Sequence, residues 1–293
     1  MKYIGVNGVP TPTAEAVLSV MDHGFMYGMG LFETFRTYGG RPFLLERHLE
    51  RLEQGCRSLG IRYSLQLNQV VQEIGELLRL NELQDGYIRL TISAGEGPLG
   101  LPSEDYKNPA VIIYVKSLSP ADSQLYVQGK SLWRLNTPRN TPEGEIRLKS
   151  LHYMNNMLAK RELREYTHLR AGNDEGMQLT TDGYLAEGIV SNLFFVQDGK
   201  LYTPDIGTGI LPGITRAFIL ELANQLELPF EEGYYRWDQL KEADEIFVTN
   251  SIQEAVPVTC LLEPTGGSHI VGNREIGPIT RQLLEQYRQK AGK

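Results

Sequence analysis

Residues 147–156 read Arg147-Leu-Lys-Ser-Leu-His-Tyr-Met-Asn-Asn156 and join two kinds of sequence. A turn-rich segment, Asn136-Thr-Pro-Arg-Asn-Thr-Pro-Glu-Gly144, comes before them. The pattern after them predicts a helix from Tyr153 to Glu165. Lys149 therefore stands between an irregular loop and a helix, where a long side chain can reach into a cleft.

The neighbours of Lys149 favour a chemical role over that of a solvated surface lysine, which is the alternative for any lysine. These neighbours are apolar: Leu148, Leu151, Tyr153 and Met154. Apolar surroundings lower the pKa of a lysine and make its amine a nucleophile. A lysine that forms a Schiff base needs such surroundings.

Composition limits the classes of function. The 293 residues suffice for one large or two medium domains. The net charge of −7 and the absence of a basic run argue against a nucleic-acid partner. Cys56 and Cys260 offer neither a disulfide framework nor a metal site, and both are expected to be reduced, buried and inert. No apolar run approaches membrane-spanning length and no signal core begins the sequence, so we expect a cytoplasmic protein without a membrane partner.

The first part of the chain predicts a small α/β domain. Asn7-Gly8 predicts a hairpin, and further strands are expected at residues 31–38, 41–45, 86–93 and 110–115. Two amphipathic helices are expected at residues 45–59 and 67–83. The apolar stripe of the first helix consists of Leu45, His48, Leu49, Leu52, Cys56 and Leu59. Arg51 lies at the edge of this stripe.

The rest of the chain predicts a second, larger domain. Residues 118–123 have the composition of a linker, which separates a small domain at 1–117 from a large domain at 124–293. Strands are expected at 130–135, 189–196, 201–202, 245–249 and 256–262, and helices at 153–166, 214–226 and 277–290. Asp182-Gly183 and Asp198-Gly199 predict hairpin turns. Strands and helices do not alternate regularly, so the fold class is α/β of a mixed, α+β kind.

Glu187 is the second candidate for chemistry. It follows a predicted hairpin and begins the apolar strand in Ala186-Glu-Gly-Ile-Val-Ser-Asn-Leu-Phe-Phe195. It is either a solvated turn carboxylate or a carboxylate held against a positive group. Paired with a pyridine nitrogen, a carboxylate keeps that nitrogen protonated and makes the ring an electron sink.

Three further features suit a phosphate group. Gly209-Ile-Leu-Pro-Gly-Ile-Thr-Arg216 opens a helix, where free N–H groups and the Thr215 hydroxyl can bind an anion; the alternative is that Thr215 only caps the helix. Thr249-Asn-Ser-Ile-Gln-Glu254 is a second candidate contact or an ordinary polar loop. Arg51 is either a cationic partner or a surface arginine.

No one of these features is specific. Together they comprise a Schiff-base lysine, a carboxylate for a pyridine nitrogen and a phosphate site made of separate segments. This is the set that pyridoxal 5'-phosphate requires.

The chain resembles the class IV (fold type IV) pyridoxal-phosphate enzymes over nearly its whole length. The resemblance rests on His48-Leu-Glu-Arg-Leu52, Leu148-Lys-Ser150, Glu187-Gly-Ile-Val-Ser-Asn192, Leu211-Pro-Gly-Ile-Thr215 and Thr249-Asn-Ser251. It implies that Lys149 forms the Schiff base and that Glu187 contacts the pyridine nitrogen. It implies further cofactor contacts from Arg51, Ser191, Asn192, Gly213, Ile214, Thr215, Asn250 and Ser251. It also implies a small N-terminal α/β domain, a larger C-terminal pseudo-barrel and a homodimer.

Two subgroups of this family fit less well. D-Amino-acid aminotransferases carry an Arg-x-His trap for the substrate carboxylate, whereas the matching loop Ser93–Ser103 has no Arg or His. Branched-chain aminotransferases usually read Gly-Asn-Tyr soon after the lysine and Phe-Glu-Gly earlier in the chain. This sequence has Leu151-His-Tyr-Met154 and Phe32-Glu-Thr34 at those places.

The resemblance is greatest to the aminodeoxychorismate lyases, in Asp22-His-Gly-Phe-Met-Tyr-Gly28, Phe32-Glu-Thr-Phe-Arg36 and the stretch from Arg139-Asn to Asn156. These enzymes convert 4-amino-4-deoxychorismate to 4-aminobenzoate and pyruvate in folate biosynthesis. Thr34 is the first candidate for contact with that substrate, followed by Tyr27, Tyr87 and Arg89, for which core or salt-bridge roles are the alternatives. A class IV aminotransferase with a 2-oxo acid acceptor is the rival reading, and a non-catalytic binding protein is a third.

Overall fold

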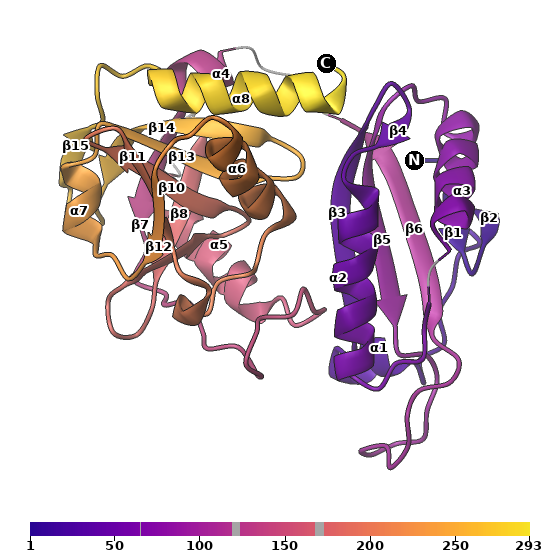
Figure 1. The fold of residues 1–293 in the computed structure, drawn as a ribbon. Helices are drawn as coiled ribbons and strands as arrows, with labels where there is room; N and C mark the ends of the chain where they lie inside the picture. The colour runs from indigo at the N-terminus through magenta and orange to yellow at the C-terminus, as the bar shows by residue number, and fades with distance from the viewer. Residues whose placement is uncertain (65, 119–123, 168–172) are drawn as a thin grey trace. The chain divides into compact units, whose positions relative to one another are not determined.

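The computed structural model describes residues 1–64, 66–118, 124–167 and 173–293. The chain forms two compact units (Figure 1), the first made mainly of Met1–Pro120 and Leu148–His152 and the second of Ala121–Arg147 and Tyr153–Ala291. Residues 119–123 of the predicted linker lie outside the described part of the chain. Within the described residues, no helix has the length and hydropathy needed to span a membrane. The predicted mixed α/β class is confirmed.

The first unit contains a fully antiparallel sheet with the strand order β2-β1-β6-β5-β3-β4. Its strands are β1 (Tyr3–Val6), β2 (Val9–Pro12), β3 (Gly30–Tyr38), β4 (Arg41–Pro42), β5 (Gly86–Ser93) and β6 (Ala110–Ser117). Its helices are α1 (His23–Tyr27), α2 (Leu45–Ser58) and α3 (Leu67–Leu80). The predicted Asn7-Gly8 turn is confirmed, because both residues have positive φ and they connect the paired strands β1 and β2.

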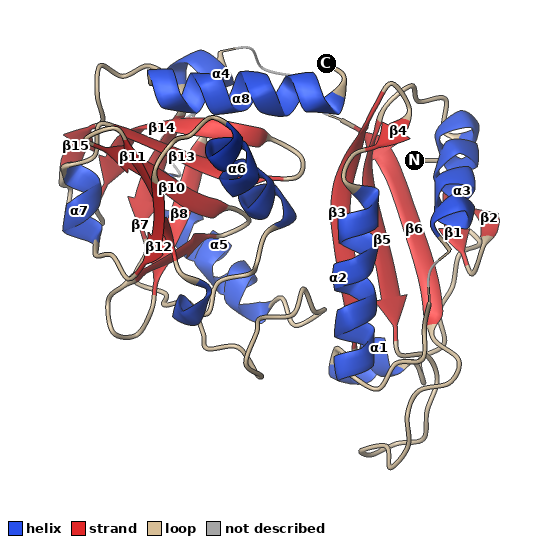
Figure 2. Ribbon diagram, viewed as in Figure 1, coloured by secondary structure: helices blue, strands red, loops and turns tan. Residues whose placement is uncertain are grey.

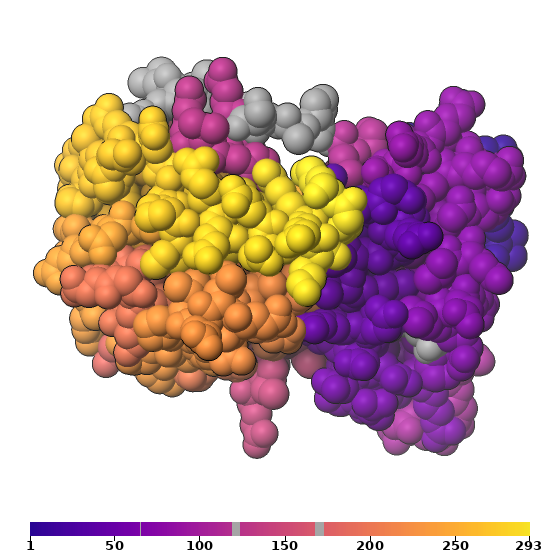
Figure 3. Space-filling view, turned by 45° about the horizontal axis from the view of Figure 1, so that its top comes forward, coloured from indigo at the N-terminus to yellow at the C-terminus, as the bar shows by residue number. Residues whose placement is uncertain are grey.

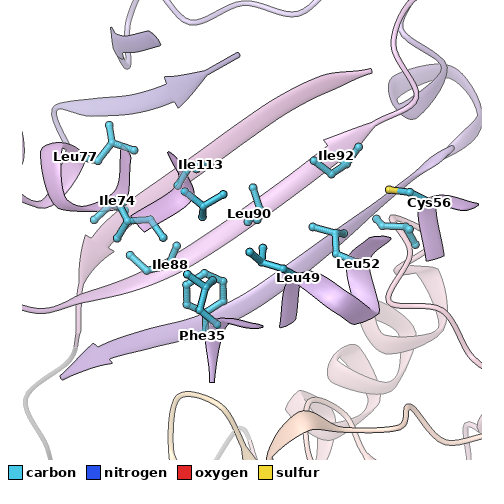
Figure 4. Close-up of a cluster of buried hydrophobic side chains, with 14 of the residues drawn as sticks. Phe35, Leu49, Leu52, Cys56, Ile74, Leu77, Ile88, Leu90, Ile92 and Ile113 are labelled. Atoms are coloured by element: carbon cyan, nitrogen blue, oxygen red, sulfur yellow. The ribbon is translucent and has the colours of Figure 1, made fainter. Parts of the chain in front are cut away.

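One face of this sheet packs against α2 and α3. The buried cluster in Figure 4 includes Phe35 of β3, Ile88 and Leu90 of β5, and Leu49 and Leu52 of α2. Successive side chains of a strand point to opposite faces, so the residues adjacent to these in β3 and β5 lie on the other face of the sheet. The predicted stripe of α2 is therefore confirmed, with Leu59 only partly buried at its end.

The two cysteines differ. Cys56 is buried in this core, and burial raises the pKa of its thiol to about 12. Cys260 is only partly buried, so the prediction that both are buried is wrong for it. Cys260 pairs with Ile270 of the short strand β15 (Ser268–Ile270), whose residues are mostly exposed.

The segment Leu148–His152 belongs to the first unit, although the sequence division placed it in the large domain. Its backbone runs along the edge of β3: the Phe32 N–H donates to the Lys149 carbonyl at 2.9 Å, and the Leu151 N–H donates to the Gly30 carbonyl at 3.0 Å. This pairing is long-range, and local sequence does not encode it. It fixes the backbone that carries Lys149.

The second unit contains a sheet with the strand order β12-β11-β10-β13-β14-β7-β8-β9, to which β15 adds beside β14. Its other strands are β7 (Lys130–Arg134), β8 (Asp174–Leu179), β9 (Leu185–Gly188), β10 (Asn192–Gln197), β11 (Lys200–Pro204), β12 (Phe230–Gly233), β13 (Glu245–Asn250) and β14 (Glu254–Leu262). The Leu185 N–H of β9 donates at 2.7 Å to the carbonyl of Tyr235, just after β12. The two ends of the sheet thus meet, and the predicted pseudo-barrel is confirmed.

Helices surround this curled sheet (Figure 2). They are α4 (Leu125–Gln128), α5 (Met154–Thr167), α6 (Ile214–Gln225), α7 (Trp237–Lys241) and α8 (Pro278–Ala291), with a 3-10 turn at Ile206–Thr208. Helix α8 packs on β13, β14 and α6, where the rings of Phe218 and Tyr287 meet edge to face at 5.6 Å. Its outer side forms part of the surface of this unit, in yellow in Figure 3.

The predicted strand at residues 189–196 is wrong at its start. Glu187 lies inside β9, and β10 begins only at Asn192. Between them the chain turns, and the Gly188 N–H donates to the Ser191 carbonyl at 2.8 Å. Glu187 is therefore a residue of β9, and a tight turn separates it from the apolar strand β10.

Candidate functional site

Lys149 faces the side of the first sheet that α2 and α3 leave open. Its Nζ lies 4.8 Å from the centre of the Phe32 ring, and the guanidinium carbon of Arg89 lies 3.6 Å from the same ring. Leu148 packs into the core below. Met154 is 73% exposed, so this part of the predicted apolar surroundings is wrong. The reason is that α5 buries Asn156, Ala159 and Leu163, which lie on a different side of the helix from Met154.

Three of the four candidate substrate residues share this open face. Thr34 lies directly opposite Arg89 in the β3–β5 pairing, and Tyr87 lies opposite Arg36. Tyr27 is placed differently: its hydroxyl accepts a hydrogen bond from the Gly100 N–H, and its carbonyl lies 3.0 Å from Nε2 of His152. Thr34, Tyr87 and Arg89 therefore form one surface with Phe32, while Tyr27 secures loops near the start of β3.

Arg51 lies on the opposite, helix-covered face and is bound to a carboxylate that sequence reasoning did not identify. Its Nε and Nη2 donate to the two oxygens of Glu33 at 2.8 and 2.6 Å, and Nδ1 of His48 lies 2.6 Å from Glu33. Burial alone would raise the pKa of Glu33, but the charge of Arg51 and the contact with His48 outweigh it and lower that pKa to about 2. For His48, burial lowers the pKa, so its ring is neutral and donates a hydrogen bond to Glu33.

Replacing Glu33 with Gln should destabilise the first unit by about 3 kcal/mol at neutral pH, because it leaves the partly buried guanidinium of Arg51 without its buried counter-charge. The pKa of Glu33 lies below its ordinary value of 4.5, so its contribution is present above pH 4.5 and is lost as the pH falls toward 2. Thermal unfolding of the two proteins between pH 7 and pH 3 measures this. Equal melting temperatures at pH 7, or a gap that widens in acid, would contradict the assignment.

Glu187 is buried and is held by donors from three segments of the second unit. Nε of Arg139 donates to its Oε1 at 2.8 Å. The Leu211 N–H and Nδ2 of Asn192 donate to its Oε2 at 3.0 and 3.3 Å. The carboxylate is therefore fixed in position and is not the solvated turn residue that was the alternative.

Two buried arginines flank this carboxylate, and sequence reasoning gave neither a role. Arg147 Nε lies 3.9 Å from Glu187 Oε1 and hydrogen-bonds to the carbonyl of Gly209, while Nη2 hydrogen-bonds to the carbonyl of Asn140. Burial and the neighbouring charge of Arg139 lower the pKa of Arg147 to about 10. The only sequence pointer to this cluster was the Arg139-Asn140 pair in the lyase-like stretch.

The start of α6 has the features of an anion site. The N-cap is Gly213, which makes no side-chain cap, so the alternative that Thr215 caps the helix is wrong. The Thr215 hydroxyl instead lies 3.2 Å from that of Ser251, which joins the helix start to the turn after β13. A Cβ on Gly213 would lie 2.0 Å from Oδ1 of Asn192, so only glycine fits there.

Ser191 lies next to Asn192 in the sequence, and Thr249 lies two residues before Ser251. The buried hydroxyls of Ser191 and Thr249 lack a hydrogen-bond partner within the described residues. A buried polar atom without a partner is costly and suggests a missing ligand or water. Asn250 differs, because its Oδ1 accepts the N–H groups of Ile252 and Gln253 and so shapes the turn that presents Ser251. These donors suit a phosphate, and the buried carboxylate suits a protonated ring nitrogen.

The predicted residues thus fall into two sets. Lys149, Arg51, Thr34, Tyr87 and Arg89 lie in the first unit, and Glu187, Ser191, Asn192, Gly213, Ile214, Thr215, Asn250 and Ser251 lie in the second. The sheet of each unit holds the residues of its own set in position. Along the chain, the second unit gives way to the first between Arg147 and Leu148.

Comparison with known proteins extends these observations. The family model for amino-transferase class IV matches residues 30–261. The chain is 45% identical to an aminodeoxychorismate lyase of Bacillus subtilis, over 98% of this chain and 94% of the relative. A 4-amino-4-deoxychorismate lyase structure from Pseudomonas aeruginosa matches with a TM-score of 0.83 and 34% identity, and covers 98% of both chains.

A third match is a branched-chain amino acid aminotransferase structure from T.th. with pyridoxamine 5'-phosphate. Its TM-score is 0.84 and its identity 27%, and the match covers 99% of this chain and 94% of that one. Both kinds of enzyme therefore share this fold. The extent of the family match and the identity to the relatives place this chain in the class IV aminotransferase family.

Proposed function

We propose that this protein is a 4-amino-4-deoxychorismate lyase that uses pyridoxal 5'-phosphate and releases 4-aminobenzoate and pyruvate. The observation that carries the proposal is the 45% identity to the Bacillus subtilis lyase over 98% of the chain. The Pseudomonas aeruginosa lyase, at 34% identity, gives further support. Thr34 also stands where the branched-chain aminotransferases usually have glycine.

The residues present fit the cofactor. We assign Lys149 as its covalent anchor and Glu187 as the partner of its ring nitrogen. The open N–H groups at the start of α6, with Thr215 and Ser251, suit its phosphate, and the buried hydroxyls of Ser191 and Thr249 offer further donors. Arg51 is the proposed cationic contact, and Glu33 orients it. When bound, the cofactor supplies an electron sink for carbanion chemistry on the substrate amine.

The chain's own groups perform the proton transfers. The Lys149 amine acts as a base and removes the proton from the substrate ring carbon that bears the substrate's amine. The enolpyruvyl oxygen leaves from the neighbouring carbon and takes a proton from Lys149. The substrate ring becomes aromatic, which drives the step forward. With the cofactor bound, Glu187 would stabilise positive charge on its ring nitrogen.

The sheet face that carries Phe32 has groups that suit the rest of the substrate, which carries two carboxylates. Arg89 offers a guanidinium there, and Thr34 and Tyr87 offer hydroxyls on the same face. A charge-assisted hydrogen bond from Arg89 would orient a carboxylate and hold the substrate ring beside Lys149.

Product analysis tests the proposal against the rival aminotransferase. Purified protein with bound cofactor is mixed with 4-amino-4-deoxychorismate and without a 2-oxo acid, and 4-aminobenzoate and pyruvate are quantified. We expect both products in equal amounts. Turnover that requires a 2-oxo acid would establish the aminotransferase reading, and bound cofactor without any turnover would establish the non-catalytic one.

Thr215→Ala should weaken cofactor binding by about 1–3 kcal/mol, the scale of one charge-assisted hydrogen bond. Arg51→Ala should weaken it similarly, and excess cofactor should restore activity in both, because several segments share the phosphate. Titration of the apo proteins with pyridoxal phosphate measures this. Thr215→Ser keeps the hydroxyl and is the matched control. Unchanged affinity in Thr215→Ala would remove the start of α6 from the phosphate site.

We further propose a cytoplasmic homodimer. Both cysteines are free thiols, which suits a reducing compartment. Exposed apolar side chains gather on two segments that hydrogen-bond to each other, through the Gly97 N–H to the Met21 carbonyl; they are Val17, Val20, Phe25, Leu99 and Leu101. Such a patch suits an interface with a second copy. Light scattering that gives the mass of a single chain would contradict the dimer.

A further inference from the structure

Arg139 lies at the centre of a buried polar cluster around Glu187. It is 7% exposed, and its Nε donates to Glu187 Oε1 at 2.8 Å. Its Nη1 donates to amide oxygens of Asn155 at 2.7 Å, Asn140 at 3.2 Å and Asn156 at 3.4 Å. Neutral amide oxygens thus hold one end of the guanidinium while the other end meets the carboxylate. Among the described residues, Glu187 is the carboxylate with which Arg139 forms an ion pair.

The charges in this cluster do not balance. Arg139 and Arg147 both approach Oε1 of Glu187, so two guanidiniums face one carboxylate. Glu143 also acts electrostatically on Arg147. In a buried setting, the charge of a neighbouring guanidinium attracts a carboxylate strongly and holds it in place.

This matters for a carboxylate that shares a proton with a ring nitrogen. If the proton moves to Glu187, the ring becomes neutral and withdraws electrons less well. A protonated Glu187 would also lose its ion pairs with both arginines, and an uncompensated buried guanidinium is costly. The arginines therefore disfavour the transfer.

We propose that Arg139 is a positioning residue that holds Glu187 in place as an unprotonated carboxylate, so that the shared proton stays on the cofactor's ring nitrogen. The inference rests on the proposed role of Glu187 beside that nitrogen. Arg147 contributes charge, but its hydrogen bonds go to the carbonyls of Gly209 and Asn140 and to the side-chain oxygen of Asn140, so it mainly secures these two loops. Arg139 has the direct bond to Glu187.

The test is ¹⁵N NMR of the bound cofactor, labelled at the ring nitrogen, because protonated and unprotonated pyridine nitrogens give well-separated signals. The wild-type protein should show the protonated form. Arg139→Gln should move the signal toward the unprotonated form, in the direction expected for Glu187→Gln. Arg139→Lys keeps a positive charge and should restore most of the protonated signal. A protonated signal in Arg139→Gln that matches wild type would overturn the proposal.

A second variant covers the case in which Arg139→Gln does not fold. Asn155→Asp is nearly isosteric and sets a carboxylate beside Nη1 of Arg139, where it competes with Glu187 for the guanidinium charge. It should shift the ¹⁵N signal in the same direction by a smaller amount. An unshifted signal in Asn155→Asp, with the cofactor bound, would also count against the proposal.

Arg288→Gln is the matched control, because Arg288 binds another buried carboxylate of the same unit, Glu254, at 2.6 Å. It should lower the melting temperature without moving the ¹⁵N signal of the cofactor-saturated protein. A control that moves the signal equally would mean that loss of any buried ion pair suffices, which would overturn the specific role of Arg139. Wild-type protein that binds no cofactor would refute the proposed function, whereas failure of the product assay alone would leave this inference standing.

Discussion

Lys149→Ala should lose turnover by about 10⁴-fold or more while the protein stays folded. The substitution removes the covalent anchor, the base and the acid together, and acid–base catalysis alone contributes about 10²–10⁴-fold. The backbone of Lys149 keeps its pairing with β3, because that hydrogen bond uses its carbonyl. The phosphate site, built elsewhere, should still bind the cofactor. Steady-state formation of 4-aminobenzoate at saturating cofactor measures the loss.

Two further variants separate charge from chemistry. Lys149→Arg keeps a positive charge over the Phe32 ring but offers no nucleophilic amine, and it should be as inactive as the alanine variant. Lys160→Ala changes an exposed lysine of α5 and should remain fully active. Lys149→Ala with more than a hundredth of wild-type turnover would show that another group performs the proton transfers.

Glu187→Gln should lower turnover by about 10²-fold or more, equivalent to about 3 kcal/mol of transition-state stabilisation. The neutral amide no longer stabilises positive charge on the cofactor's ring nitrogen. Proton removal from the substrate and departure of the enolpyruvyl group both depend on that charge. The structure adds a second effect. Both oxygens of Glu187 accept hydrogen bonds, so the amide nitrogen of Gln must face a donor. The lost bond should cost about 1–3 kcal/mol of stability.

The two effects are measured apart. Turnover is determined at saturating cofactor, and stability is determined by thermal unfolding with and without cofactor. Cofactor affinity should change little, because the phosphate contacts are intact. Wild-type turnover together with a lowered melting temperature would make Glu187 a structural residue of β9 and remove it from the chemistry.

The parts of the fold that sequence predicted are those with local causes. Asn7-Gly8 forms its turn because its two residues favour positive φ, and the stripe of α2 is buried as its spacing predicts. Strand β5 matches the predicted bounds, 86–93, and its first five residues alternate between buried and partly buried positions. The short strands β12 and β15 were missed, since each is largely exposed and has little apolar pattern.

The site was less predictable where it depends on distant contacts. Local sequence does not show that Leu148–His152 pairs with β3, so the sequence division placed Lys149 in the other unit. Arg51 was read as a phosphate contact without the buried Glu33 to which it is bound, because Glu33 lies in a strand 18 residues earlier. Arg139 approaches Glu187 from 48 positions away. Ion pairs of this kind are set by the barrel and have no local signature.

We propose that Lys149 is the residue that carries the cofactor. This role is tested most directly by reducing the wild-type protein with borohydride, which fixes the cofactor to its lysine, followed by digestion and mass spectrometry. We expect a single modified peptide, with the pyridoxyl phosphate group on Lys149 and loss of the yellow colour on reduction. Modification at any other lysine, with Lys149 unmodified, would contradict it.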